Sequence, residues 1–188
     1  MRLDLYNNEW YKLNGNIFQR IIWYFINVLF FINPLFPISF VKIYLLRCFG
    51  AKVGKNVLIK PSVNIKYPWN LKIGNNVWIG EDVWIDNLAL VSIGNNVCIS
   101  QGAMLLCGNH NYKKETFDLM IGEIILEDSV WVGAKSVVCP GVTLKEGTVL
   151  AVGSIISKNT EANSVYQGIP GVKVRERKNS IVQKKVMP

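Results

Sequence analysis

The sequence predicts an all-β fold: a solenoid of about five three-sided coils, interrupted by one protruding loop and preceded by a short helical segment. Three observations support this prediction. Aliphatic residues recur at every sixth position, the pattern repeats again at an interval of twenty residues, and prolines lie inside the repeats where they would break a helix. Such interlocked periods are typical of stacked repeats, each of which buries its apolar face against the next.

The first segment, residues 1–50, lacks this rhythm. Its apolar run from Ile21 to Ile32 contains twelve residues and is followed by Pro34 and Pro37, whereas about 20 apolar residues are needed to span a bilayer. The run predicts two short helices, and two interpretations of them stay open. The helices either cap the open end of the solenoid, whose bare strand edges would otherwise invite pairing, or residues 17–49 lie in a membrane interface as peripheral contacts.

Residues 51–172 carry the repeat. Every hexapeptide begins with Val, Ile or Leu, and three hexapeptides with a two-residue insert separate Val53, Ile73 and Ile93. We expect the first and fifth residues inside each coil, and the Gly, Asn and Asp of the middle positions at its corners, where turns need left-handed or tight backbone. The hexapeptides are VGKNVL, IKPSVN, IKYPWN, IGNNVW, IGEDVW, IDNLAL, IGNNVC, ISQGAM, LLCGNH, LEDSVW, VGAKSV, VCPGVT, LKEGTV, LAVGSI and ISKNTE.

The rhythm stops once, at residues 108–125, and this interruption begins with the only histidine of the chain, His110. A loop that leaves the coil carries its side chains out of the apolar interior. An imidazole titrates near neutral pH and can take a proton from an attacking hydroxyl. No serine or cysteine with a second base beside it is visible, so a covalent intermediate on such a nucleophile is not expected. His110 is therefore the candidate general base.

Charge is concentrated at the two ends of the chain, whose net charge is +8. Residues 1–60 hold eight Lys and Arg against two acidic residues, and the C-terminal tail, residues 173–188, holds six against one. Such basic ends fit an anionic membrane or a phosphorylated ligand. Nucleic acid is not an expected partner, because no nucleic-acid-binding motif accompanies the charge.

The four cysteines are scattered without a CxxC pair, and one histidine cannot build a ligand cluster, so no metal is expected. Free thiols are typical of a reducing compartment. The N-terminus also lacks the basic-then-apolar pattern of a secretory signal. These observations favour a cytoplasmic location, with the inner face of the membrane as an alternative.

Longer motifs lie over the repeat: "LRCFGAKVGKNV", "IKYPWNLKIGNNVWIG", "IGNNVCISQGAML", "GNHNY…TFDL", "VWVGAKSVVCPGVTL" and "GIPGVKVRER". On these stretches, residues 50–177 resemble the hexapeptide-repeat acyltransferases, and most closely their colanic-acid-type polysaccharide acetyltransferases. The resemblance implies a left-handed parallel β-helix, a hand that β-crossovers ordinarily lack. It also implies acetyl transfer from acetyl-CoA in a homotrimer with active sites at subunit interfaces. His110 would act as the base, on a loop that reaches toward the neighbouring subunit.

The resemblance also implies binding residues. Asp86 and Asn87, one coil before His110, match polar residues that meet the acceptor, although a plain corner turn is the equal alternative; the Asn87 amide can both donate and accept. Tyr112 and Asp118 in the loop are further acceptor candidates. Cofactor-binding candidates for the pantetheine chain are Trp131, Ala134 and Val152, and those for the nucleotide and phosphates are Ser157, Lys158 and Arg175.

The leading prediction is an O-acetyltransferase acting on a sugar of an exopolysaccharide or surface-glycan precursor. N-acetylation of an amino sugar and acetylation of a small molecule stay open, because the repeat does not define the acceptor. A non-catalytic structural or ligand-binding β-helix is the alternative of another class, but it gives no reason for an interruption that carries the only histidine. A carbonic anhydrase on this scaffold needs three zinc-binding histidines, and this sequence has one. A sugar nucleotidyltransferase needs a further nucleotide-binding domain, for which 188 residues leave no room, so neither activity is expected.

Overall fold

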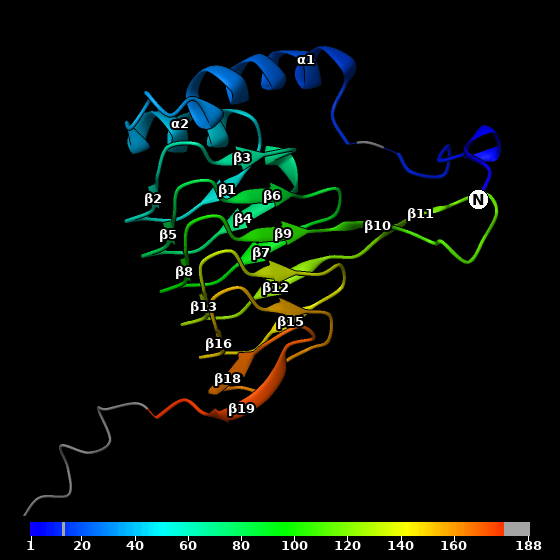
Figure 1. Ribbon diagram of the computed structural model, residues 1–188. Helices are drawn as coiled ribbons and strands as arrows, with labels where there is room; N and C mark the ends of the chain where they lie inside the picture. The colour runs from blue at the N-terminus through cyan, green and yellow to red at the C-terminus, as the bar shows by residue number, and fades with distance from the viewer. Residues whose placement is uncertain (13, 179–188) are drawn as a thin grey trace, which may run out of the picture.

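The computed structural model describes residues 1–12 and 14–178 and shows a column of stacked coils with two helices lying across one end (Figure 1). Each complete coil contributes one short strand to each of three sheets, within which these strands run parallel. Five coils are complete, and β18 begins a sixth. The predicted solenoid of about five three-sided coils is confirmed.

The three sheets form the three sides of the column. Sheet A contains β1 (Lys52–Val53), β4 (Leu71–Ile73), β7 (Val91–Ile93), β12 (Ile124–Leu126) and β15 (Thr143–Leu144). Sheet B contains β2 (Leu58–Ile59), β5 (Trp78–Ile79), β8 (Cys98–Ile99), β13 (Trp131–Val132), β16 (Val149–Leu150), β18 (Ser164–Gln167) and the antiparallel β19 (Val172–Glu176). Sheet C contains β3 (Asn64–Ile65), β6 (Trp84–Asp86), β9 (Met104–Leu106), β14 (Val137–Val138) and β17 (Ile155–Ile156).

The twenty-residue interval sets the register of the first coils. Lys52 pairs with Lys72 in sheet A, and Trp78 pairs with Cys98 in sheet B. First and fifth residues of the hexapeptides face inward as predicted, except Asn109, which is exposed on a strand outside the coils. Those buried in the first three coils include Ile59, Val63, Ile65, Val77, Ile79, Val83, Ile85, Val97 and Ile99. A continuous apolar core therefore runs along the column.

Asparagines at one corner explain the polar positions of the repeat. The Lys55 N–H donates to Asn75 Oδ1 at 2.8 Å, the Asn75 N–H to Asn95 Oδ1 at 2.9 Å, and the Asn95 N–H to Asp128 Oδ1 at 2.7 Å. The following residue has a positive φ in successive coils, for example 57° at Asn76, a conformation that asparagine tolerates better than most residues. A ladder of side chains thus ties each corner to the next coil.

The N-terminal helices close the first coil. They are α1 (Ile17–Ile26), the π-helical η2 (Asn27–Ile32) and α2 (Ser39–Cys48); short 3₁₀ turns also occur at Leu3–Leu5 and Pro68–Asn70. Trp23 Nε1 donates to the Ile65 carbonyl at 2.8 Å, and Lys42 Nζ donates to the Lys60 carbonyl at 2.7 Å. These bonds satisfy strand-edge groups that would otherwise stay unpaired. No helix in the described ranges is both long and apolar enough to cross a bilayer.

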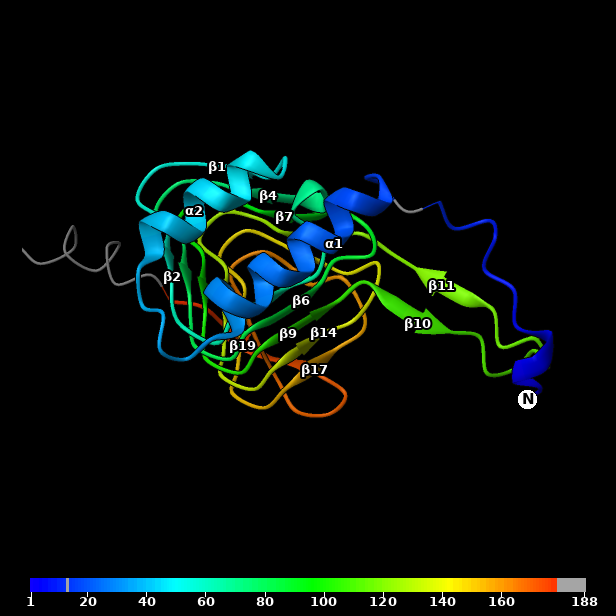
Figure 2. The same ribbon diagram turned by 90° about the horizontal axis from the view of Figure 1, so that it is seen from above.

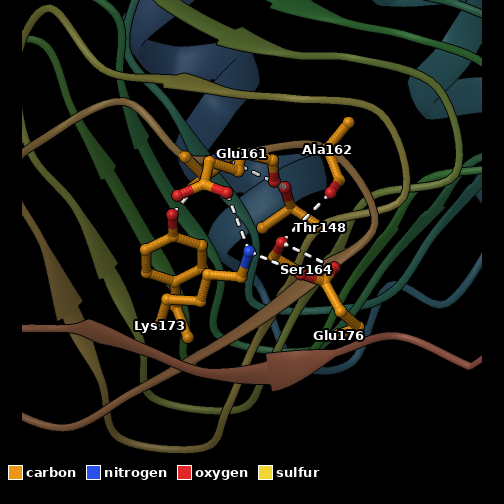
Figure 3. Close-up of polar contacts among 8 residues, drawn as sticks. Thr148, Glu161, Ala162, Ser164, Lys173 and Glu176 are labelled. Carbon is orange, nitrogen blue, oxygen red and sulfur yellow. Dashed lines mark hydrogen bonds and ion pairs between the residues drawn. The ribbon is translucent and has the colours of Figure 1, made fainter.

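The opposite end is closed by a strand and a polar cluster. Strand β19 pairs antiparallel with β18 and continues to Glu176, so the predicted start of the tail at residue 173 falls inside this strand. Figure 3 shows Lys173 between two carboxylates: its Nζ lies 2.7 Å from Glu161 and 2.6 Å from Glu176. The hydrogen bonds to Glu161 and then to Glu176 raise the pKa of Lys173 above its usual value.

Candidate active site

A two-stranded arm leaves the column where the repeat is interrupted. Strand β10 (Gly108–His110) runs outward and β11 (Leu119–Ile121) returns antiparallel to it. At the base of the arm, the Gly122 N–H donates to the Cys107 carbonyl at 2.9 Å. Figure 2, which looks down on the helical end, shows the arm extending well beyond the outline of the coils. The interruption therefore builds a β-hairpin, and the chain rejoins sheet A at Ile124.

His110 is held by the returning half of the arm. Its Nδ1 lies 2.9 Å from the Phe117 carbonyl oxygen, and the two rings stack in parallel with centroids 4.4 Å apart. Phe117 has a φ of 49°, a left-handed conformation that is unusual for an aromatic residue. Since a carbonyl only accepts hydrogen bonds, Nδ1 carries the hydrogen and Nε2 keeps its lone pair. The geometry makes Nε2 the basic nitrogen.

His110 borders a cavity of about 340 Å³ on the arm. Tyr112 lies in the same lining and is 77% exposed. Asp118 is not part of that lining, and its carboxylate pairs with Lys114 at 2.8 Å. The hydrogen bond from Lys114 also holds the pKa of Asp118 below its usual value. Of the two acceptor candidates on the arm, the structure therefore brings Tyr112 to His110. The remaining lining residues are Asn109, Asn111, Lys113 and Met120.

Asn87 lies inside the column. Its side chain has no exposed surface. Its Oδ1 accepts from the Tyr67 N–H at 2.9 Å, and its NH₂ group donates to the carbonyls of Tyr67 and Asn70. The amide therefore fixes the turn around Tyr67 and leaves no free edge for a sugar, which argues against the predicted acceptor contact of Asn87.

Asp86 lies beside the base of the arm. A Cβ added to Gly108 would lie 3.6 Å from Asp86 Oδ2. The carboxylate pairs with Lys66 at 2.8 Å, and 14% of the Asp86 side chain stays exposed. Asp86 is thus near the arm but two residues inward of His110 along the hairpin.

Two of the CoA candidates meet at one corner of the column. Ala134 follows β13 and Val152 follows β16, and the Gly153 N–H donates to the Ala134 carbonyl at 2.8 Å. The coils approach so closely here that a Cβ on Gly133 would lie 2.5 Å from the Leu150 carbonyl oxygen. Only glycine fits such an approach. The glycine of the motif "VGA" therefore lets the two coils approach closely at this corner.

The other CoA candidates lie on different parts of the last coils. Trp131 on β13 is 48% exposed, and its Nε1 donates to Ser100 Oγ at 2.9 Å. Ser157 and Lys158 are exposed at the next corner, directly after β17. Arg175 is exposed on β19, opposite Val165 of β18.

The arm and the Ala134–Val152 corner lie at opposite ends of the strands of sheet C. The corner precedes β14 and β17, whereas the arm follows β9, and all three strands belong to that sheet. Within one copy of the chain, His110 and the predicted pantetheine contacts are therefore separated by the face of the column that sheet C forms. The arm also extends away from its own column (Figure 2).

The N-terminal residues run beside the arm, a contact that the sequence analysis missed. The Arg2 N–H donates to the Glu115 carbonyl at 2.7 Å, and the Tyr6 ring lies 5.7 Å from the His110 ring. Tyr11 donates to the Leu88 carbonyl at 2.6 Å, and burial raises the pKa of Tyr11 to about 12. Residues 1–12 carry no repeat, so the only signal was their content of aromatic residues.

The cysteine nearest the arm, Cys107, does not provide a second reactive centre. All four cysteines are free, and burial raises the pKa of Cys107 to about 11. A thiol in this state is a poor nucleophile near neutral pH. In the described ranges, no group of three or more His, Cys, Asp or Glu residues is placed to hold a metal ion.

The chain has relatives among known proteins that are recognisable by their sequences. No family model matches the chain. Over 136 residues the chain is 37% identical to the Escherichia coli protein named "Putative colanic acid biosynthesis acetyltransferase WcaF". The match covers 72% of this chain and 75% of that protein.

Solved structures share the architecture. The hexapeptide-repeat acetyltransferase VCA0836 of Vibrio cholerae aligns with a TM-score of 0.77 at 21% identity, over 86% of this chain and 92% of that chain; a second structure of it contains acetyl-CoA. A galactoside acetyltransferase in complex with coenzyme A aligns with a TM-score of 0.76 at 25% identity, over 88% of this chain and 84% of that chain. The likeness confirms the left-handed parallel β-helix.

Proposed function

Because the chain belongs to the hexapeptide-repeat acetyltransferases, we propose that it moves the acetyl group of acetyl-CoA to a sugar hydroxyl of an exopolysaccharide or surface-glycan precursor. The observation that carries this proposal is the 2.9 Å contact between His110 Nδ1 and the Phe117 carbonyl, which leaves Nε2 as the base beside a cavity. Neighbours crystallised with acetyl-CoA or CoA support the donor. The name of the WcaF relative supports the acceptor class.

In the proposed reaction, Nε2 of His110 takes the proton of the acceptor hydroxyl while its oxygen attacks the thioester carbonyl. A new oxygen–carbon bond forms, the carbon–sulfur bond breaks, and the CoA thiolate leaves with the proton that the imidazolium returns. The Phe117 carbonyl stabilises the imidazolium through Nδ1. The raised pKa of Cys107 supports direct transfer over an acyl-cysteine intermediate.

The assignment of the base is tested by CoA release from acetyl-CoA with a panel of sugar acceptors. His110→Ala should lower kcat by about 10²–10⁴-fold, the usual contribution of a general base. Glu115→Ala is the matched control, because this exposed residue lies on the same arm outside the cavity lining. Turnover of His110→Ala equal to that of the Glu115→Ala control would refute the role of His110.

The nature of the acceptor is tested with matched pairs of sugars. A hydroxyl acceptor and its amino-sugar counterpart should both be offered to the enzyme, and mass spectrometry should locate the acetyl group. Transfer to oxygen alone supports the proposal. Transfer to nitrogen alone would make the protein an N-acetyltransferase with the same base.

We also propose that the active site is completed by a second copy of the chain, in a homotrimer. The support is that His110 and the Ala134–Val152 corner lie at opposite ends of the strands of sheet C, and that the arm runs outward from the column. Copies carrying His110→Ala and copies carrying Val152→Asp should each be inactive alone. Co-expressed, they should regain activity, because mixed assemblies contain interfaces with an intact arm and an intact corner. Recovery of no activity would count against a shared site.

We propose a cytoplasmic location, which the four free thiols support. A reducing environment and the acetyl-CoA donor coincide there. Alkylation of Cys48, the exposed thiol, in intact and opened cells would test this. Labelling by a membrane-impermeant reagent should require that the cells be opened, and labelling of intact cells would contradict the location.

A further inference from the structure

The helical cap has an outer face that the fold does not use. Its inner face buries Trp23, Asn27, Phe31, Lys42 and Leu46 against the first coil. On the outside, large apolar side chains of the same helices and of the turn between them are more than half exposed. Six of them are Phe18, Ile22, Phe25, Leu29, Leu35 and Phe40, which we call the outer cap face. Exposed apolar patches of this kind mark interaction sites on soluble domains.

The cap helices and the first coil contain basic residues and no acidic ones, and the first acidic residues after them, Glu81 and Asp82, lie on the second coil. Between residues 10 and 80 the sequence contains nine Lys and Arg and no Asp or Glu. In the described part of the chain, Lys66 alone among them forms an ion pair, with Asp86. The exposed ones are Lys12, Arg47, Lys52, Lys55, Lys60 and Lys72. An apolar face with basic residues near it is complementary to a bilayer that has an apolar interior and anionic headgroups.

We propose that the outer cap face docks on an anionic lipid bilayer. A second copy placed face to face would bring two uncompensated basic surfaces together, which costs free energy. In Figures 1 and 2, α1 and α2 lie side by side across the end of the column. The helices thus lie parallel to the membrane, as interfacial helices do.

The dimensions of the helices fit an interfacial position rather than a spanning one. Helix α1 has ten residues and η2 has six, so together they are at most about 24 Å long at ~1.5 Å per residue. The hydrocarbon core of a bilayer is about 30 Å thick. The same helices also hold Trp23 and Lys42 in bonds to the first coil, and those bonds fix the helices across the column.

This orientation brings the arm close to the lipid. The arm follows β9, the third strand of sheet C from the capped end, so its base lies about 10 Å below the first coil at a strand spacing of ~4.8 Å. The helical layer adds about 10 Å. A site about 20 Å from the bilayer suits a sugar carried on a membrane lipid, given the layer dimensions above; this last step rests on the proposed function.

The proposal is tested by co-sedimentation of the full chain with vesicles of phosphatidylcholine, alone or mixed with phosphatidylglycerol. The wild type should bind the mixed vesicles, and added salt should weaken this binding. Phe18→Ser, Leu35→Ser and Phe40→Ser combined should lower the partition coefficient about tenfold or more, because less apolar area enters the lipid. The matched control combines Ile169→Ser, Val172→Ser and Val174→Ser, three exposed apolar residues near the other end of the column, and should bind as the wild type does.

A charge variant and an activity measurement complete the test. Lys52→Ala, Lys55→Ala and Lys60→Ala combined should weaken binding to mixed vesicles without changing the fold. The serine cap variant should keep wild-type CoA release with a water-soluble acceptor, so loss of docking and loss of the proposed activity are read separately. Failure of the wild type to bind, unchanged binding by the cap variant, or a smaller assembly in light scattering of that variant would each overturn lipid docking.

Discussion

The two ends of the column cover their strand edges with different kinds of contacts. Both would expose strand edges, and both cover them. At the first coil, helices do so with Trp23, Lys42 and other side chains that hydrogen-bond to the backbone. At the last coil, β19 pairs along β18, and Lys173, Glu161 and Glu176 form a charged cluster over the end (Figure 3).

The difference lies in the outward surface. The charged end exposes ion pairs together with three aliphatic residues, whereas the helical end exposes the larger side chains of Phe18, Leu35 and Phe40 without ion pairs among the described residues. Covering strand edges does not require exposed aromatic side chains, since the exposed apolar residues of the charged end, Ile169, Val172 and Val174, are all aliphatic. The exposed phenylalanines of the helical cap therefore have a cause other than closing the coil, and variants at the two ends separate these contributions.

The largest expected effect is at the inner face of the helical cap. Trp23 is 2% exposed, packs on Phe31 and Phe49, and donates to the Ile65 carbonyl. Trp23→Ala should lower the free energy of unfolding by about 3–5 kcal/mol, since it opens a cavity and orphans an acceptor. Chemical denaturation measures this loss. Trp78→Ala, at a residue that is 63% exposed, is the control, and an equal loss in both variants would contradict the role of the cap in stability.

The next largest effect is expected in the pH dependence of the unfolding free energy, to which Lys42 contributes. Burial lowers the pKa of Lys42 to about 8, whereas an unfolded lysine titrates near ~10.4. Between these values the unfolded chain binds more protons, so this residue makes stability rise with pH across that window. Below about pH 8 both states are protonated and the cost of burying the charge is fully present.

Lys42→Met should remove this rise. The difference in unfolding free energy between wild type and variant should shift toward the wild type between about pH 8 and about pH 10.4, by at most about 3 kcal/mol. Lys60→Met, at an exposed lysine, should show no such shift. Parallel stability profiles for wild type and Lys42→Met would show that Lys42 is not desolvated in the folded state.

The coils were predictable because one short pattern determines them many times. Each aliphatic first position, such as Ile59 or Ile79, has the same environment in its coil, and the twenty-residue interval sets the register of the first coils. The cap was only partly predictable. Its apolar run indicates helices, but a pattern does not distinguish the face toward the coil from the face toward the outside. That distinction comes from tertiary contacts such as the bond from Trp23 to Ile65.

The candidate site divides in the same way. His110 was identifiable because it stands where the rhythm breaks, but its partner Phe117 was not, since the contact depends on the fold of the arm. Tyr6 lies more than one hundred residues away from His110 in sequence, and no period links them. Asn87 was predicted to meet a sugar on the family resemblance, with a corner turn as the alternative; the sequence does not reveal that the backbone of the neighbouring coil uses its amide.

A smaller effect is expected at the charged end. Tyr166 is 8% exposed, and its hydroxyl accepts from the Glu161 N–H at 3.0 Å. Tyr166→Phe keeps the ring and removes the acceptor, so stability should fall by about 1 kcal/mol. Thermal unfolding of this variant beside Tyr24→Phe, at a tyrosine that is 64% exposed, isolates the hydroxyl. A loss as large as that of Trp23→Ala would mean that the charged end contributes as much as the helical cap.

The smallest effect is expected at Lys173. Its two ion pairs lie at the surface, with the Glu161 and Glu176 side chains 70% and 66% exposed, and solvent and salt screen such pairs. Lys173→Met should therefore leave the thermal midpoint within error of the wild type at physiological salt, with a small decrease at low salt. A decrease that persists at high salt would show that the cluster closes the last coil by packing rather than by charge. In that case the two ends would be alike in mechanism, and only the outward surface of the helical cap would still distinguish them.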